Sequence, residues 1–446
     1  MRETMMRLLS QAICVAVVLV AGVASSHIGG TLSVVPAAYA QSDDKPKERE
    51  TRKTPALRNA VYEKLAEAQE LAEAKDYVGA QAILDEMIGE TSKKRSLNSY
   101  ELANVYNTYA FLRYANEDYK GSLRYYELVI EQPDIPLALE INTRYTIAQL
   151  YFVQEDWKNG VDALLVWLDL TDKPNSNAFV LLANGYYQLK DYDESLRNIN
   201  VAMDMEKAAG KIPKEQWYAL AQFLYYDKGD IDSALETVKS LILYYPKKQY
   251  WVQAAQIYTE KRDDDRALAM LIATHEQGLL DRSAELVNLA YYYLNAEAPY
   301  PAAKVLAEGL DSETLEATSK NYELTGNAWR QAQEVQKSLP MLETAASKSE
   351  NGDLFSRLGS VYLDLDQNQK AVDAIRKGLD RGGVKRPDQA RLALGMALFN
   401  LGEFNAARRA FREAAKDERA KTYAQQWLRY ISSEENRLEE LAKEMG

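Results

Sequence analysis

The sequence predicts an all-α fold: a right-handed α-solenoid of about ten helix hairpins, followed by a C-terminal capping helix. Two observations support this prediction. Small residues recur in pairs along the chain, with a mean spacing of 36.3 residues from one pair to the next, and a turn signal separates the members of most pairs. A chain of 446 residues with such a short period is better explained by one array of stacked hairpins than by several unrelated domains.

The beginning of the chain has the features of a secretory signal peptide. Arg2 and Arg7 give it a basic start, an apolar run covers residues 12–24, and the small-x-small motif AYA ends at Ala40. We therefore expect residues 1–40 to be removed and the remaining chain to be exported to the periplasm. The alternative is an uncleaved inner-membrane anchor, although the apolar run is shorter than the roughly 20 residues that a spanning helix needs.

The segment QSDDKPKERETRKT, residues 41–54, separates the predicted signal peptide from the hairpins. Nine of its fourteen residues are charged and none is a large apolar residue. Such a segment cannot bury apolar surface, so we expect a disordered tether. We interpret it as a spacer, and a docking segment is the alternative.

Each predicted hairpin has one small residue in each of its two helices. The first lies at Ala68, Ala110, Ala148, Ala183, Ala221, Ala255, Ala290, Gly326, Gly359 and Gly395. The second follows twelve or thirteen residues later, at Ala80, Ser122, Gly160, Ser195, Ala234, Ala267, Ala303, Ser338, Ala371 and Ala407. We expect the two helices to approach most closely at these residues, because a large side chain would hold the backbones apart. Close packing then offsets the roughly 0.5–1 kcal/mol that a glycine costs inside a helix.

A short turn signal lies between the two helices of a hairpin. In four hairpins it is an aspartate followed by an aromatic residue, at Asp76-Tyr77, Asp118-Tyr119, Asp156-Trp157 and Asp191-Tyr192. We expect the aspartate to remain at the turn and the aromatic ring to pack into the next helix. The acidic run at 263–265 also lies at a turn, and we interpret it as helix capping rather than as a calcium site.

This combination resembles the tetratricopeptide repeat, which has a period near 34 residues. The resemblance also rests on an aromatic residue or leucine that follows the first small residue by three positions, at Tyr151, Tyr186, Tyr258, Trp329, Tyr362 and Leu398. It implies a solenoid of about ten repeats over residues 55–415. Thr54 would cap the first helix and Pro55 would begin it.

Residues 416–446 are predicted to form the capping helix. An apolar stripe runs along it, formed by Tyr423, Trp427, Ile431, Leu438, Leu441 and Met445. Charged residues lie on the other side of the same helix. We therefore expect the apolar side to cover the end of the stack and the charged side to face water.

The exported chain has few groups that could support catalysis or hold a metal. Cys14, the only cysteine, lies in the predicted signal peptide, so no disulfide and no thiolate metal site remains. His275 would be the only histidine after cleavage, and neither a phosphate-binding glycine loop nor a G-x-S-x-G motif is present. We therefore expect a protein without enzyme activity, cofactor, metal or small-molecule substrate.

The charge distribution argues against a nucleic-acid ligand, because the net charge is −12, and −13 without residues 1–40. One segment is nevertheless basic: residues 370–412 contain ten Lys or Arg and four acidic residues. We expect a basic patch that steers an acidic partner, formed by Arg376, Lys377, Arg381, Lys385, Arg386, Arg391, Arg408, Arg409 and Arg412. A solvated helix face is the alternative interpretation.

The resemblance also implies where a partner would bind, because in tetratricopeptide arrays the first helix of each hairpin lines a concave groove. The implied groove residues are Asn107, Phe111, Tyr114, Asn142, Tyr145, Gln149, Phe152, Asn177, Asn184, Tyr187, Tyr218, Gln222, Tyr225, Gln256, Asn288 and Tyr291. Tyrosine offers rigid contact area, and the amides of Asn and Gln pair with a peptide backbone, so this set suits a protein segment. The alternative is that the tyrosines only stack between repeats.

These features together favour a periplasmic scaffold that binds other proteins. The segment ERETRKTPALRNAVYEKLAEAQ, residues 48–69, followed by many repeats, looks like the periplasmic tetratricopeptide proteins associated with TonB-type energy-transduction systems. That resemblance implies an accessory of a TonB/ExbB/ExbD-type complex that energises outer-membrane receptors for iron complexes. The alternatives are a general adaptor for outer-membrane biogenesis, polysaccharide export or a pilus, and, less favoured, an enzyme built on the repeat scaffold.

Overall fold

The computed structural model describes residue 52 and residues 55–89 and 96–445. Within these residues the chain forms 21 helices and no strand, which confirms the predicted all-α fold. The predicted signal peptide, residues 1–40, lies outside the described residues. So does the charged tether, residues 41–54, except for Arg52. In the described part, no helix has both the length and the apolar character needed to cross a membrane.

The chain divides into two compact units, and the boundary between Tyr250 and Trp251 falls inside one helix. We describe each unit by itself. The helices of unit 1 are α2 (Asn59–Glu73), α3 (Tyr77–Gly89), α4 (Ser99–Ala115), α5 (Tyr119–Ile130), α6 (Leu137–Val153), α7 (Trp157–Leu170), α8 (Ser176–Gln188), α9 (Tyr192–Ala208), α10 (Glu215–Asp227), α11 (Ile231–Tyr244) and the start of α12 (Lys248–Glu260).

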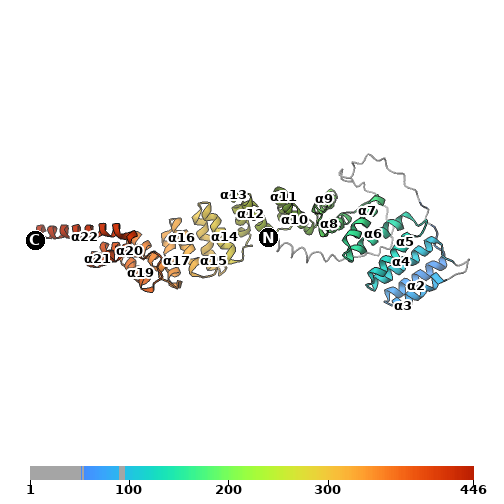
Figure 1. Cartoon of the computed structure of the whole chain (residues 1–446), viewed down its shortest axis with the longest axis horizontal. Coiled ribbons are helices and arrows are strands. Elements are labelled where there is room, and N and C mark those ends of the chain that lie inside the picture. The colour runs from blue at the N-terminus through green and yellow to red at the C-terminus, as the bar shows by residue number, and fades with distance from the viewer. Residues whose placement is uncertain (1–51, 53–54, 90–95, 446) are drawn as a thin grey trace. The chain divides into compact units, whose positions relative to one another are not determined.

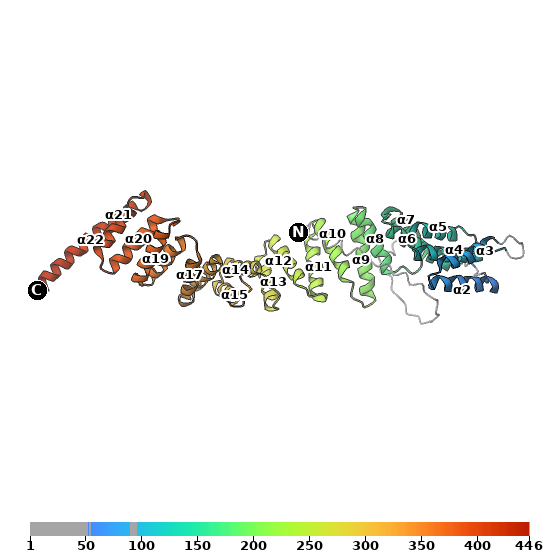
Figure 2. The same cartoon turned by 90° about the horizontal axis from the view of Figure 1, so that it is seen from below.

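Unit 2 continues the same alternation of short helices. It contains the remainder of α12, then α13 (Asp264–Glu276), α14 (Ser283–Asn295), α15 (Pro299–Asp311), α16 (Ser319–Gln331), α17 (Val335–Lys348), α18 (Asp353–Asp364), α19 (Asn368–Arg381), α20 (Pro387–Asn400), α21 (Phe404–Ala414) and α22 (Glu418–Met445). In both units consecutive helices pack as hairpins, for example α4 with α5 and α18 with α19 (Figures 1 and 2).

The two helices of a hairpin meet at the small residues that recur in the sequence. A Cβ atom built on Gly395 would lie 2.6 Å from a ring carbon of Phe411, and one on Gly359 would lie 2.3 Å from Cγ1 of Ile375. These separations are far below a van der Waals contact, so both positions require glycine. The close approach that was expected between the two helices is therefore present in these hairpins.

Serine reinforces this approach in two of the three hairpins where it is the second small residue, whereas the buried Ser338 hydroxyl has no hydrogen-bond partner among the described residues. The Ser122 hydroxyl donates a hydrogen bond of 2.8 Å to the carbonyl oxygen of Ala110. The Ser195 hydroxyl makes the equivalent bond of 2.8 Å to Ala183. In each case the donor and the acceptor are the paired small residues of one hairpin, so the bond joins the two helices where they are closest.

The turn inside each hairpin has a common geometry. The residue before the second helix's N-cap has a positive φ in ten turns, at Lys75, Glu117, Glu155, Lys190, Gly229, Arg262, Glu297, Gln333, Asp366 and Gly402. The N-cap aspartate then accepts a hydrogen bond from a backbone N–H three residues later, at 2.9 Å for Asp76 and 2.9 Å for Asp118. Asp263 caps α13 in the same way, at 3.2 Å from the N–H of Arg266, as its interpretation as a capping residue predicted.

The start of the first helix differs from the expectation. α2 begins at Asn59 rather than at Pro55, because Arg58 is extended and is held by Glu101 of α4. The Arg58 guanidinium donates to the Glu101 carboxylate at 2.7 and 2.6 Å, and the Arg58 backbone N–H donates at 3.2 Å. The Glu101 side chain is completely buried. This ion pair therefore joins the first hairpin to the second.

The helix α22 packs on the last hairpin over only part of its length. Ile431 is buried, and Trp427 stacks on Phe411 with ring centroids 5.4 Å apart. Tyr423, Leu438 and Leu441 of the predicted stripe are exposed. For Leu438 and Leu441 the reason is length, because α22 has 28 residues whereas α21 beneath it has 11. Tyr423 is exposed although it lies between the buried Ala420 and Ala424. The helix covers the end of the stack, as expected of a capping helix, and then extends beyond it (Figure 2).

We predict that Gly395→Leu destabilises unit 2 by about 1–3 kcal/mol, because the new side chain overpacks the contact with Phe411. Thermal unfolding followed by circular dichroism measures this change. Gly89→Leu is the control, since a Cβ atom there has no neighbour within 4 Å. Equal loss of stability in the two variants would contradict the role given to Gly395.

We predict that Glu101→Gln loosens the first hairpin in a pH-dependent way. The hydrogen bonds from Arg58 lower the pKa of Glu101, although burial opposes this shift. The stabilisation is therefore present above the unfolded-state pKa of about 4.3 and is lost as the pH falls through the lower folded-state value.

Hydrogen-exchange protection of the α2 amides measures this effect. We expect Glu101→Gln to reduce protection roughly tenfold at neutral pH, as for a buried charged hydrogen bond of about 1–3 kcal/mol. The difference from wild type should shrink only as the pH falls through the lowered folded-state pKa of Glu101, where its carboxylate becomes protonated and uncharged like the glutamine. Amides of α21 are the internal control, and a difference that persists unchanged at low pH would rule out an electrostatic cause.

Candidate interaction site

Unit 1 holds thirteen of the sixteen residues that the resemblance implied for a groove, all on the first helices of hairpins. Asn142 and Asn177 are exposed. Phe152, Tyr218 and Gln222 are buried and do not present their side chains to a partner, which corrects the expectation for these three residues. The other members are half-buried: Asn107, Phe111, Tyr114, Tyr145, Gln149, Asn184, Tyr187 and Tyr225.

Several tyrosines of this set pack against neighbouring helices. The Tyr187 ring of α8 lies 5.8 Å from Phe223 of α10, edge to face. The Tyr145 ring of α6 lies 4.6 Å from Trp167 of α7. The Tyr225 hydroxyl accepts a 2.8 Å hydrogen bond from the Asn200 amide. These contacts agree with the alternative interpretation, in which tyrosines stack between repeats.

Burial also affects the pKa of these phenols. It raises the pKa of Tyr145 and of Tyr187 above the usual value, with no nearby cation to offset the loss of solvation. A neutral hydroxyl packed between helices serves the fold by satisfying its hydrogen bonds there. The groove predicted for unit 1 is thus partly filled by the chain's own rings.

In unit 2 the three remaining members of the set are exposed. Gln256 lies on α12, and Asn288 and Tyr291 lie on α14. The Tyr291 side chain has 45% of its surface exposed. The hydroxyls of Thr259 and Tyr292 are 2.6 Å apart and join α12 to α14 beside these residues.

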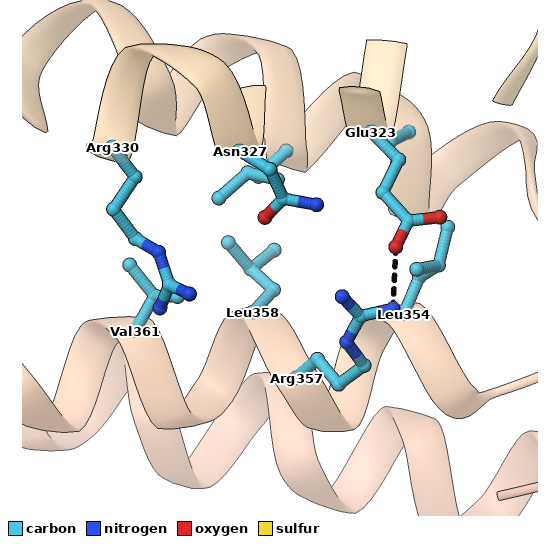
Figure 3. Close-up of a pocket in the computed structure, with 9 residues that line it drawn as sticks. Glu323, Asn327, Arg330, Leu354, Arg357, Leu358 and Val361 are labelled. Atoms are coloured by element: carbon cyan, nitrogen blue, oxygen red, sulfur yellow. Dashed lines mark hydrogen bonds and ion pairs between the residues drawn. The ribbon is translucent and has the colours of Figure 1, made fainter. Parts of the chain in front are cut away.

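A pocket of about 40 Å³ lies between α16, α17 and α18 of unit 2 (Figure 3). Its apolar wall is formed by Leu342, Ala345, Leu354, Leu358 and Val361, and its polar rim by Glu323, Asn327, Arg330 and Arg357. Glu323 of α16 and Arg357 of α18 form an ion pair across the pocket. This bond ties together the first helices of two successive hairpins.

Two polar side chains at this pocket have no partner among the described residues. The Asn327 amide points into the space between α16 and α18, and Arg330 stands at one end of it (Figure 3). Neither side chain makes a hydrogen bond or an ion pair within the described part of the chain. An amide can donate and accept at once, and a free guanidinium can donate to a carboxylate or a carbonyl. The pocket therefore combines an apolar wall with unused polar groups.

The sequence analysis missed these pocket residues, although the repeat register contained them. The three rim residues of α16 are Glu323, Asn327 and Arg330. They lie three positions before the small residue Gly326, one after it and four after it. Tyr218, Gln222 and Tyr225 have the same offsets from Ala221. Extending the register by one more hairpin would have found Glu323, Asn327 and Arg330.

The predicted basic patch is only partly available. Arg391 and Arg408 are half-buried, and the other seven cations are exposed. Arg386 forms a bidentate ion pair with the buried Asp388, in which its guanidinium donates to the two carboxylate oxygens at 3.0 and 2.8 Å. Arg408 pairs with Glu435. Lys377 and Arg381 both lie over the ring of Phe355, at 4.4 and 5.3 Å.

These four cations therefore stabilise the end of unit 2. Arg386 lowers the pKa of Asp388, as expected for a buried carboxylate beside a guanidinium. The patch cations with neither an ion pair within 4 Å nor a ring contact in the described structure are Arg376, Lys385, Arg391, Arg409 and Arg412. The basic patch is thus a smaller set than the sequence suggested.

The described residues do not bring three or more His, Cys, Asp or Glu side chains into a group that could hold a metal ion. The geometry at the pocket is that of a contact surface, with no nucleophile held beside a base. Its chemistry is limited to apolar burial, hydrogen bonding and charge pairing.

A family model described as tetratricopeptide repeat matches residues 388–416, which cover α20 and α21. MamA from Desulfovibrio magneticus RS-1 is a similar solved structure, 15% identical over 37% of this chain and 93% of that chain, with a TM-score of 0.28. YrrB, a TPR protein with an unusual peptide-binding site, is 19% identical over 38% of this chain and 82% of that chain, with a TM-score of 0.32. No curated protein matches the sequence.

Proposed function

We propose that this chain, whose hairpin at residues 388–416 is a tetratricopeptide repeat, is a scaffold that binds a segment of another protein. The observation that carries the proposal is the pocket between α16 and α18, where Asn327 and Arg330 lack partners beside an apolar wall. The Asn327 amide is half-buried, and polar groups in that position are normally satisfied in folded proteins, so an unpaired one suits a ligand. Arg330 is exposed beside it, so its guanidinium is accessible to the same ligand.

The size of the pocket indicates what kind of ligand it takes. Small-molecule and cofactor sites enclose about 300–1,000 Å³. The α16–α18 pocket has about 40 Å³, which is room for part of one side chain. A protein segment can place one aliphatic side chain against Leu358 and Val361 and still bind mainly outside the pocket.

The polar rim suits a polypeptide as well. The Asn327 amide can pair with both the N–H and the C=O of a peptide backbone. Arg330 can bind a carboxylate of the same segment. Exposed residues on α12 and α14, among them Gln256 and Tyr291, offer the same chemistry on other first helices of unit 2.

We predict that a photo-reactive phenylalanine at Asn327 cross-links to a partner protein in intact cells. The same substitution at Lys304, which is exposed on α15, is the control. A matched pair of variants tests the energetics: Asn327→Ala with Arg330→Ala should weaken partner binding at least tenfold, whereas Lys304→Ala should not change it. Cross-linking from Lys304 but not from Asn327 would place the binding surface elsewhere.

We further propose that the scaffold works in the periplasm as an accessory of a TonB/ExbB/ExbD-type complex. The support for this is the signal-like start of the sequence and the resemblance of residues 48–69. The general envelope adaptor remains the second candidate, because the same N-terminal features suit any exported scaffold.

We predict that TonB-, ExbB- or ExbD-type proteins co-purify with this chain from cross-linked membranes. A fusion of alkaline phosphatase to the C-terminus, which is active only after export, tests the compartment independently. Active fusions together with recovery of outer-membrane biogenesis, polysaccharide-export or pilus proteins would select the general adaptor. An inactive fusion would reject the periplasmic assignment.

A further inference from the structure

One edge of unit 1 brings two loops together. The first comprises residues 207–214, that is, the last two residues of α9 and the loop that leads to α10, and the second comprises residues 243–248, that is, the last two residues of α11 and the loop that leads into α12. The Tyr245 hydroxyl donates a 2.8 Å hydrogen bond to the carbonyl oxygen of Pro213, and the rings of Tyr218 and Tyr244 stack 6.1 Å apart. We call these two loops the basic edge.

Three large apolar side chains protrude from the basic edge. Leu243 is 71% exposed, Ile212 is 57% exposed and Tyr244 is 43% exposed. Exposing aliphatic side chains to water is unfavourable, by roughly 25 cal/mol for each Å². Ile212 lies in the loop between α9 and α10, and Leu243 and Tyr244 lie in the last turn of α11, so all three are accessible to a soft apolar medium at this edge.

Lysines surround these apolar side chains. They are Lys207, Lys211, Lys214, Lys247 and Lys248. Lys207 lies 3.5 Å from Asp204, and Lys247 pairs with Glu215 at 2.6 Å. Lys211 and Lys214 have no carboxylate partner among the described residues, and the Lys214 ammonium lies 5.7 Å from the Trp217 ring.

This basic character is local. The corresponding loop between α5 and α6, residues 131–136, carries Glu131 and Asp134 and no cation. The loop between α7 and α8, residues 171–175, carries Asp172 and Lys173 and is neutral. In a chain with a net charge of −12, five lysines at one edge are therefore a local exception.

We propose that the basic edge docks on the surface of a bilayer that contains anionic lipids. Lysine ammonium groups gain energy near anionic headgroups, aliphatic side chains insert at the boundary with the acyl chains, and tyrosine is favoured at that depth. A folded acidic protein would need pockets shaped for Leu243 and Ile212, whereas lipid accommodates protruding side chains without a matching shape. The proposal is independent of the pocket between α16 and α18.

Flotation of the purified full chain with vesicles tests the proposal. We expect the chain to float with vesicles of phosphatidylcholine and phosphatidylglycerol and not with vesicles of phosphatidylcholine alone. Added salt should weaken binding, because the Debye length shortens from about 10 Å at 0.1 M to about 3 Å at 1 M.

Two pairs of substitutions separate the contributions. Lys211→Ala with Lys214→Ala should lower the partition coefficient about twenty-fold, from roughly fivefold for each lysine. Ile212→Ser with Leu243→Ser should also weaken binding but should leave its salt dependence in place. Lys304→Ala with Lys320→Ala, which removes two exposed lysines of unit 2, is the matched control and should bind as wild type does.

Three results would overturn the proposal. The wild-type chain could fail to float with anionic vesicles, it could float equally with neutral ones, or the control pair could lose as much binding as the Lys211 and Lys214 pair. Circular dichroism of each variant shows that its helices are intact. Loss of a cross-linked protein partner in the lysine variant, without vesicle binding by wild type, would assign the basic edge to a protein.

Discussion

The close approach of two helices at a pair of small residues is the contact on which the rest of each hairpin depends. At Gly395 and Gly359 the partner side chain already occupies the place of a Cβ atom, so the two backbones can be close only because one residue has no side chain. In two further hairpins the paired small residues are joined by the hydrogen bonds of Ser122 and Ser195. Hairpins held together in this way stack along each unit.

The turn completes this arrangement. With the helices held close, only a tight connection fits, and it uses a residue with positive φ before the N-cap, which is an aspartate in six of the ten turns. Eight of the ten turn residues are not glycine, although the left-handed conformation costs other residues roughly 1–2 kcal/mol. Hydrogen bonds across the turn and packing of the following aromatic ring offset that cost. Ion pairs such as Arg58 with Glu101 then join one hairpin to the next.

Surfaces that could bind a partner occur where this packing leaves side chains without contacts to neighbouring helices. In unit 1 tyrosines such as Tyr187 fill the spaces between hairpins, so little of the first-helix face remains open. In unit 2 the α16 residue in the register of Tyr187 is Arg330, whose guanidinium stays unpaired beside a small apolar pocket. The basic edge has a different origin, because it lies at the ends of α9 and α11 and in the loops that follow them, away from the paired small residues of the hairpins. The pocket in unit 2 has room for part of one side chain, and the basic edge in unit 1 carries lysines.

The sequence by itself determined the helical class, the hairpin period and the closest contact within each hairpin, because Gly395 and its equivalents are imposed by local packing that repeats with the sequence. It also contained the register of Asn327 and Arg330. Only the tertiary structure decided which polar residues are available: Gln222 is buried, Arg386 and Arg408 are paired, and Arg330 is not. The physical reason is that exposure and pairing depend on side chains from neighbouring helices, whose identities do not follow the repeat. The meeting of the loops at Ile212 and Leu243, thirty-one residues apart, likewise needed the fold.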